Sequence, residues 1–186
     1  MTLDLLSQLI LQKSEFRGET TITVTPESLH EVCRYCRAML GYDYLLDITA
    51  VDHLDRSPRF EVVYQLNNAE TAEQLRIKTS PLSSLQSLPS LPTVSDIWPG
   101  ANWIEREVFD LSGIHFENHP DLRRIAMWEG YPHHPMRKDF PLEGVPTDIP
   151  EIAFSEAAPL KGGPFVTATT NTSPREREPR ARQPQT

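Results

Sequence analysis

A histidine and two cysteines are spaced in a way that could bind a metal ion. His30, Cys33 and Cys36 form an H-x-x-C-x-x-C array, and side chains three residues apart share one face of a helix. A structural zinc site needs four ligands, usually from two separate elements, but the chain has no other cysteine. Free cysteines are among the most buried residue types. We therefore predict that Cys33 and Cys36 pack in a core, with a metal or redox role as the less favoured alternative.

Two other pairs of titratable residues are poorly placed for catalysis. His133 and His134 are adjacent, so their side chains point in different directions in an extended chain and cannot both chelate one ion. Glu105 and Glu107 do not face each other on a helix, which argues against an acid–base pair. Glycine-rich phosphate loops, H-E-x-x-H and G-x-S-x-G are all missing. We predict a solvated or partner-contacting loop at His133–His134, and no catalytic, cofactor-binding or metal-binding residue in this chain.

The composition is that of a single acidic globular domain. The chain has 186 residues, 38% of them hydrophobic, and carries 26 acidic against 18 basic residues for a net charge of −8. This length can bury a core without disulfides, and the acidity argues against wrapping a nucleic acid. Two cysteines exclude a disulfide-rich scaffold and a four-cysteine iron–sulfur site from this chain alone. No apolar stretch reaches the ~20 residues of a membrane span, and no basic region precedes Leu3–Leu11 as in a signal peptide.

Hydrophobic periodicity predicts helices and strands in the order α-β-α-β-β-β over the first eighty residues. The predicted helices cover the first sixteen residues, ended by Gly18, and Pro26–Leu40, capped by Thr25 and Gly41. The predicted strands are Thr21–Thr25, Leu45–Val51, Arg59–Leu66 and Gln74–Thr79. Because Leu45–Val51 is almost continuously apolar, we expect both of its faces to be covered.

The next part of the chain is predicted to be a loop followed by one interrupted helix. Residues 80–92 are rich in Ser, Leu and Pro and indicate irregular turns. Helical character returns over Thr93–Ser112, capped by Ser95 or Asp96, interrupted at Pro99–Gly100 and closed by Gly113. Its second half is predicted to bury Ile104, Val108 and Leu111, and to pair Arg106 with Asp110 at i,i+4.

These elements favour an α+β fold, a two-layer sandwich of helices on a small mixed β-sheet, followed by an extended proline-rich C-terminal tail. We predict three segments. Residues 1–125 form the α+β domain, residues 126–150 form an extended docking segment, and residues 151–186 form a proline-rich tail. Because the end of the tail is charged and almost free of apolar residues, it is expected to be disordered alone or wrapped on a partner.

Aromatic and charged residues are concentrated between Trp98 and Pro141. Three tryptophans and several arginines lie there among acidic residues, and aromatic residues with arginine are typical of interface hot spots. Isolated surface ion pairs contribute little stability, so side-by-side opposite charges suggest pairs that a partner buries. A helix with a solvated charged face and a following loop explains the composition equally well.

Two runs in this region resemble a known family. WIEREVFDLSGIHFENHPDLRRI (Trp103–Ile125) and HPMRKDFPLEG (His134–Gly144) are similar to the C-type or 30 kDa-type subunit of bacterial respiratory complex I, the NADH–quinone oxidoreductase. The matching positions are Glu105, Arg106, Glu107, Asp110, Gly113, Ile114, His119–Arg124 and Arg137–Pro141. The upstream order of elements also fits the α+β domain of this family.

The resemblance implies a non-catalytic subunit of the peripheral arm, at the cytoplasmic face of the bacterial inner membrane. The complex transfers electrons from NADH through Fe–S centres to quinone and couples this to ion translocation. FMN and the Fe–S clusters are expected in partner subunits, and the chief partner is expected to be the D-type large subunit that forms the quinone pocket. The implied subunit-interface residues are Glu105, Arg106, Glu107, Asp110, His119, Asp121, Arg123, Arg124, Arg137, Lys138 and Asp139.

Two alternatives stay open from the sequence. Membrane-bound hydrogenases and related dehydrogenase complexes use similar modules beside their large subunit. A nucleic-acid-binding module is a remote alternative, supported only by Arg123–Arg124, Arg137–Lys138 and the arginines of the tail. The acidic balance of the chain argues against it.

Overall fold

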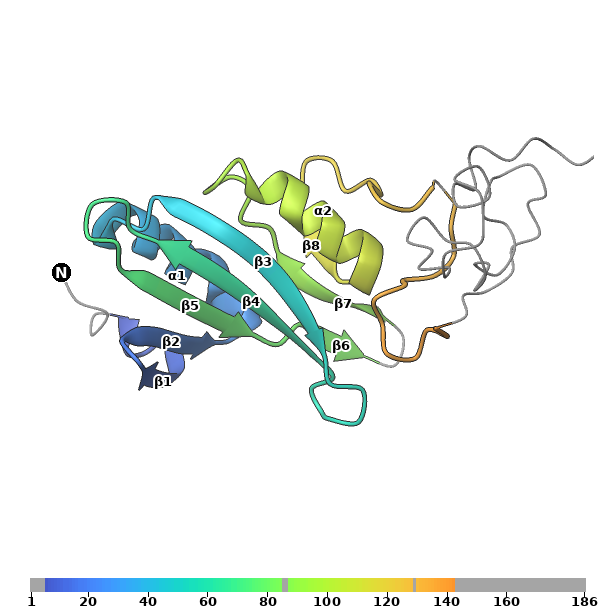
Figure 1. Ribbon diagram of the computed structural model, residues 1–186, viewed down its shortest axis with the longest axis horizontal. Helices are drawn as coiled ribbons and strands as arrows, with labels where there is room; N and C mark the ends of the chain where they lie inside the picture. Colours follow the sequence, from blue (N-terminus) through green and yellow to red (C-terminus); the bar gives the residue numbers. More distant parts are fainter. Residues whose placement is uncertain (1–5, 85–86, 129, 143–186) are drawn as a thin grey trace, which may run out of the picture. The chain divides into compact units, whose positions relative to one another are not determined.

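A five-stranded mixed sheet forms the centre of the fold (Figure 1). The computed structural model describes residues 6–84, 87–128 and 130–142. The strands are β1 (Ile10–Phe16), β2 (Glu19–Val24), β3 (Tyr44–Asp52), β4 (Phe60–Asn67) and β5 (Gln74–Thr79), in the order β1-β2-β5-β4-β3. In this sheet β2 and β5 pair in parallel and the other neighbours are antiparallel. The predicted α+β class with a mixed sheet is therefore confirmed, whereas the C-terminal tail lies outside the described residues.

A smaller sheet and two helices complete the described fold. The small sheet has the order β6-β7-β8, with β6 (Leu82–Ser84) antiparallel to β7 (Ser87–Pro92), and β7 parallel to β8 (His115–Glu117). The helices are α1 (Pro26–Leu40) and α2 (Ala101–Ser112), and α2 lies alongside β3 (Figure 1). Neither helix of the described chain is long and apolar enough to cross a membrane.

Alternation along β4 and β5 separates a buried face of the large sheet from a polar one. Along β4 every second side chain from Phe60 is buried, and β5 continues the pattern with Leu75 and Ile77. On the other face Lys78 Nζ lies 2.8 Å from Glu61 Oε1. Burial of one face by alternate apolar residues fixes the strand register, because a shift by one residue would expose the whole set.

Helix α1 packs into this core as its sequence predicts. Thr25 Oγ1 accepts a hydrogen bond from the Ser28 N–H at 3.4 Å, and Gly41 ends the helix with a φ of +75°. Cys33 and Cys36 are fully buried free thiols, and burial raises the pKa of Cys36 to about 12. Their predicted role in core packing is confirmed.

The predicted N-terminal helix is wrong where the structure describes it. Residues Ile10–Phe16 form β1, which pairs with β2 through a two-residue turn. Arg17 and Gly18 in this turn have φ values of +53° and +84°, and two positive φ angles are typical of a type I′ hairpin. Every β1 residue after Ile10 is exposed, so this edge strand has no buried face to impose an alternating pattern. Residues 1–5 lie outside the described chain.

Three further local predictions are corrected. Residues 80–92 contain β6 and β7 rather than a loop alone, because β7 pairs with β8 far along the chain and local patterns do not reveal such pairing. β3 is an edge strand with Leu46 exposed, so it is not covered on both faces. α2 begins only after Pro99–Gly100, and its N-cap Gly100 makes no side-chain capping bond, so neither Ser95 nor Asp96 caps it.

Candidate docking surface

Helix α2 buries charged side chains on the side that faces the fold. Its buried stripe is Ala101, Glu105, Val108 and Ser112, which follows helical spacing with a glutamate in its middle. Of the predicted stripe only Val108 is buried, while Ile104 and Leu111 are half-buried. The predicted stripe left out position 105 because it was built from apolar residues alone, and a glutamate does not belong to such a pattern.

Glu105 connects α2 to the end of β7. Its Oε1 accepts a hydrogen bond from the Val94 N–H at 2.7 Å, and its Oε2 accepts one from the Thr93 hydroxyl at 2.5 Å. The carboxyl is wholly buried. Burial raises the pKa of Glu105 to about 7, although both hydrogen bonds act to lower it. Glu105 is therefore a structural link whose charge depends on pH near neutrality.

His119 packs beside Glu105 and fixes the loop that follows β8. Its side chain is fully buried, and its Nε2 lies 3.7 Å from Glu105 Oε2. Nδ1 accepts a hydrogen bond from the Asp121 N–H at 3.0 Å, so Nε2 carries the proton that faces the Asn102 carbonyl at 3.1 Å. Burial lowers the pKa of His119. The imidazole is thus held as a neutral tautomer that orients the loop.

Asp110 holds the next part of the loop with four hydrogen bonds. Its Oδ2 accepts from the backbone N–H groups of residues 125, 126 and 127 at 2.7–3.0 Å, and its Oδ1 from Arg124 Nη1 at 2.7 Å. Burial would raise the pKa of Asp110, but these bonds together hold it below its usual range. The predicted Arg106–Asp110 pair is wrong, because Arg124 pairs with Asp110 while Arg106 Nε donates to the Arg123 carbonyl at 3.0 Å.

The C-terminal end of α2 is closed by a glycine and two side chains from the following segment. Gly113 has a φ of +73°, and a Cβ there would collide with Arg137 and His134. Arg137 Nε donates to the Ser112 carbonyl at 2.7 Å, and His134 Nδ1 donates to the Asp110 carbonyl at 2.9 Å. Cations near a helix C-terminus also complement its dipole. His134 is half-buried and bonds within the fold, so it is not simply solvated; a contact with a partner stays a prediction.

Asp52 and Arg59 form a second anchor that no sequence signal revealed. Arg59 donates to both Asp52 oxygens at 2.7–2.8 Å, and Asp52 also accepts from the Lys138 N–H at 2.9 Å. Arg59 Nη1 reaches Asp139 Oδ2 at 3.0 Å. The bond from Arg59 holds the pKa of Asp52 well below its usual range. Asp52 and Arg59 are far from residues 138–139 in the sequence, and only the folded chain brings them together.

The outward side of α2 carries an exposed aromatic residue covered by a cation. Trp103 is 64% exposed, and the Arg106 guanidinium lies 4.8 Å from its ring centroid. Glu107 is exposed one turn along, and the neighbouring loop presents Arg123, whose side chain is 76% exposed and pairs with Asp121 at 2.7 Å. Arg106 itself is buried, at 7% exposed. We call Trp103, Glu107, Asp121 and Arg123 the α2 surface.

The comparisons with known proteins agree on one family. Residues 22–146 match the family described as respiratory-chain NADH dehydrogenase, 30 Kd subunit. The chain belongs to this family. The C subunit of NADH-quinone oxidoreductase from Geobacter metallireducens is 46% identical over 136 residues, which cover 73% of this chain and 82% of that protein. Membership of the 30 Kd subunit family confirms the prediction of a non-catalytic peripheral-arm subunit of complex I.

Two further relatives of this 30 Kd subunit family member are informative. The C/D 2 subunit of NADH-quinone oxidoreductase from Aquifex aeolicus is 39% identical over 150 residues, covering 75% of this chain and 25% of that protein. A solved structure of the membrane-bound sulfane sulfur reductase, an archaeal respiratory membrane complex, contains a similar chain. It matches with a TM-score of 0.61 and 26% identity, covering 75% of this chain and 85% of that one.

The implied interface residues of the 30 Kd family signature divide into two groups. Those that bond within the chain's own fold are Glu105, Arg106, Asp110, His119, Arg124 and Arg137. Those with more exposed side chains are Glu107, Asp121, Arg123, Lys138 and Asp139, of which Asp121, Arg123 and Asp139 also form ion pairs within the chain. Of the aromatic residues in this region, Trp98, Phe116 and Tyr131 are buried, which leaves Trp103 as the exposed aromatic of α2. Within the described residues, no three His, Cys, Asp or Glu side chains are grouped to hold a metal ion.

Proposed function

We propose that this protein docks through the α2 surface on the D-type large subunit that forms the quinone pocket. The single observation that carries the proposal is the exposed Trp103, whose ring is held by a contact with the buried Arg106, on an otherwise charged surface. Tryptophan and arginine are the residue types that most often dominate interface energetics. The Aquifex relative, named as a C/D subunit, supports the choice of partner, because two subunits joined in one chain must lie within reach of each other.

The buried network behind α2 prepares this surface for binding. Arg106 is fixed by the Arg123 carbonyl, and the loop that presents Arg123 is fixed by Asp110 and His119. A side chain already held in its bound geometry loses little conformational entropy on association. Glu107 and Arg123 have opposite charges, so they would select a partner surface of matching pattern and favour a unique orientation.

The role that follows is positional. In this proposal FMN and Fe–S clusters reside in partner subunits, and this chain holds the quinone-pocket subunit and the peripheral-arm Fe–S subunits in fixed geometry. It is attached to the cytoplasmic face of the bacterial inner membrane through these partners. Electrons pass from NADH to quinone in the neighbouring subunits, and this chain contributes shape and charge.

A second candidate is the equivalent module of a related membrane-bound respiratory complex. The likeness to a chain of the archaeal sulfane sulfur reductase supports this second candidate. That chain is 26% identical, whereas the Geobacter protein, which supports the first candidate, is 46% identical. The identity of the large subunit recovered with the chain separates the two. A partner from a hydrogenase-like complex in place of an NADH–quinone oxidoreductase would replace the first proposal with this one.

The test uses the full chain in its complex, with Trp103→Ala and Glu107→Ala as docking variants. Each has a matched control: Phe16→Ala removes another exposed aromatic with an adjacent arginine, and Glu31→Ala removes an exposed glutamate of α1. We expect both docking variants to lose co-purification of the large subunit although their melting temperatures fall by no more than a few degrees, and both controls to retain it. Equal recovery of the large subunit with all four variants would contradict the proposal.

The absence of chemistry in this chain has its own test. The purified full chain is assayed for NADH oxidation, for quinone reduction and for bound flavin, iron and zinc. We expect no turnover and no stoichiometric cofactor. Turnover by the lone chain, or one bound cofactor per chain, would overturn the positional role.

A further inference from the structure

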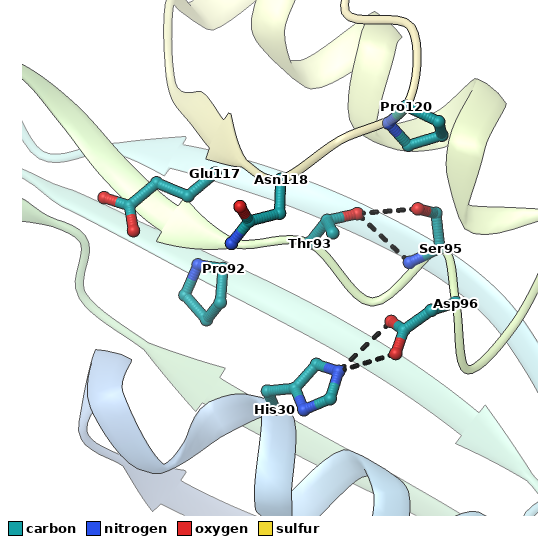
Figure 2. Close-up of a pocket in the computed structure, with 8 residues that line it drawn as sticks. All are labelled: His30, Pro92, Thr93, Ser95, Asp96, Glu117, Asn118 and Pro120. Carbon is teal, nitrogen blue, oxygen red and sulfur yellow. Dashed lines mark hydrogen bonds and ion pairs between the residues drawn. The ribbon is translucent and has the colours of Figure 1, made fainter.

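The described chain has a groove beside the β7–α2 connection, and none of the α2-surface residues lines it. Its volume is about 530 Å³, and it lies between α1, the end of β7 and the turn after β8. Figure 2 shows His30 on one wall, Thr93 and Ser95 along the floor, and Asn118 and Pro120 on the other wall. A volume of this size is typical of sites that bind small ligands or side chains, which span roughly 300–1,000 Å³.

The hydrogen-bond donors along the floor are already used inside the fold. The Thr93 N–H donates to the Glu117 carbonyl at 3.0 Å, the Val94 N–H to Glu105 at 2.7 Å, and the Ser95 N–H to Thr93 Oγ1 at 3.1 Å. Pro92 and Pro120, which also line the groove, have no N–H. A phosphate or carboxylate needs convergent N–H groups or cations, so the groove is unsuited to an anion.

The acceptors, by contrast, remain accessible. The Asp96 side chain is 61% exposed, and Glu117 is exposed at the end of β8. Figure 2 shows the two carboxylates at opposite ends of the groove with the Asn118 amide between them. The residues that line the groove include no Lys or Arg. His30 pairs with Asp96 at 2.9 Å, and the Ser90 hydroxyl donates to one Glu117 oxygen at 2.9 Å, which leaves the second Glu117 oxygen for a ligand.

We propose that this groove receives an extended segment of a neighbouring subunit that carries two basic residues, one for Asp96 and one for Glu117. The inference rests on the proposed function, since it assumes that the chain works inside the complex, but it concerns a second surface. The aliphatic stems of Lys or Arg would lie against Pro92 and Pro120, as such stems commonly cover apolar surface. The two carboxylates, one at each end of the groove, would select a segment whose basic residues have the matching spacing and would fix its position along the groove.

Crosslinking in the assembled complex identifies the occupant. The photoreactive variant is His30→p-benzoylphenylalanine, whose side chain enters the groove (Figure 2), and the control is Glu31→p-benzoylphenylalanine, one residue along on an exposed part of α1. We expect the residue-30 variant alone to crosslink a segment of another subunit with two Lys or Arg residues close in sequence. No crosslink, a crosslink to a second copy of this chain, or one to a segment without basic residues would overturn the proposal.

Charge removal tests the chemistry of the contact by the salt concentration that releases this protein from the complex. The double variant Asp96→Asn with Glu117→Gln is compared with His30→Gln, which removes the same internal pair as Asp96→Asn but keeps the carboxylate. We expect release of the double variant at clearly lower salt, and His30→Gln to behave as the wild type. Wild-type behaviour of the double variant, or equal weakening by His30→Gln, would overturn the proposal. Both groove variants should still join the complex at low salt, since the groove is a second contact. If the wild-type protein itself is not recovered with the complex, the docking function is refuted, which is a different outcome from failure of the groove proposal.

Discussion

Helices α1 and α2 end in the same way and each bury one side, but different interactions attach them to the fold. Each ends at a glycine with a φ of +73° to +75° and turns one side to the core. α1 buries Leu29, Val32, Cys33 and Cys36, whereas α2 buries Glu105, Arg106 and Asp110. Apolar burial is non-directional, but hydrogen bonds to a buried carboxylate require partners in fixed positions. We infer that α1 stabilises the fold and that α2 orders the loop behind a surface.

The largest expected effect is the loss of the Asp110 carboxylate. Asp110→Ala leaves the Arg124 guanidinium and three backbone N–H groups without their acceptor, so we expect a loss of about 3–5 kcal/mol in the free energy of unfolding. Leu29→Ala in α1 should cost a comparable ~2–5 kcal/mol, but through a cavity. Denaturant unfolding measures both.

The two mechanisms are separated by adding Arg124→Ala to each variant. In the Asp110 variant, Arg124→Ala should lower the free energy of unfolding little further, because Arg124 has already lost its partner. In the Leu29 variant it should lower the free energy of unfolding by as much as it does in the wild type. Simple additivity in both backgrounds would show that Asp110 and Arg124 do not act as a unit.

The C-terminal glycines give the next largest difference. Gly41→Ala places a Cβ at a positive φ, which costs about 1–2 kcal/mol, and meets a movable Asn68 side chain. Gly113→Ala introduces the same strain and also collides with Arg137 and His134, whose hydrogen bonds close the helix. We expect it to cost at least about 1 kcal/mol more. Thermal or denaturant unfolding of the two variants decides this, and equal losses would mean that the segment beyond Gly113 is loosely held.

A pH dependence should distinguish α2 from α1 at a smaller scale. Burial raises the pKa of Glu105 to about 7, above its unfolded value of about 4.3. The folded state therefore binds a proton more readily than the unfolded state. The stability that this proton contributes is fully present below pH ~4.3 and is lost as the pH rises through about 7, amounting to on the order of 3–4 kcal/mol. The titratable groups that face Glu105 are His119, Asp96, Cys33 and Tyr64.

The measurement is the free energy of unfolding of the wild type and of Glu105→Gln between pH 5 and pH 8. The wild type should lose stability relative to the variant as the pH rises. His119 and His134 have lowered pKa values through burial, so they act in the opposite direction on the acid side. The contribution of His134 should cancel in the difference, whereas that of His119, which lies 3.7 Å from Glu105, enters it. A difference that stays constant with pH would contradict a protonated Glu105.

The smallest effect on the isolated chain is expected from the α2 surface itself. Trp103→Ala removes an exposed ring and its contact with Arg106, worth about 0.5–1 kcal/mol, and Glu107→Ala should change the free energy of unfolding by less than ~0.5 kcal/mol. Melting curves of the lone protein check this. A loss of several kcal/mol would mean that these side chains support the fold and are not primarily docking residues.

Much of α1 and the central strands could be predicted because their signals are local. Thr25, Pro26 and Gly41 mark the ends of α1, and β4 and β5 alternate between core and solvent. β1 escaped prediction because an exposed edge strand has no buried face, and β7 because its partner β8 lies beyond α2. The burial of Glu105 within the fold could not be predicted, since its partners, Thr93, Val94 and His119, become neighbours only in the folded chain.

The family signature identified the right region but not the role of each residue. In its Glu–Arg–Glu run Glu105 is buried in the fold and Glu107 is exposed, because positions 105 and 107 lie on different sides of the helix. The same run thus contains a structural anchor and a candidate contact. Burial and hydrogen bonding of individual side chains, which spacing does not reveal, separate the two.

Hydroxyl-radical footprinting of the tryptophans, in the lone protein and in the assembled complex, tests the docking role most directly. Trp103 is 64% exposed and Trp98 is 4% exposed, so Trp98 serves as an internal control that should react slowly in both states. Our account predicts that Trp103 reacts rapidly in the lone protein and becomes protected in the complex. Equal reactivity of Trp103 in the two states would contradict it.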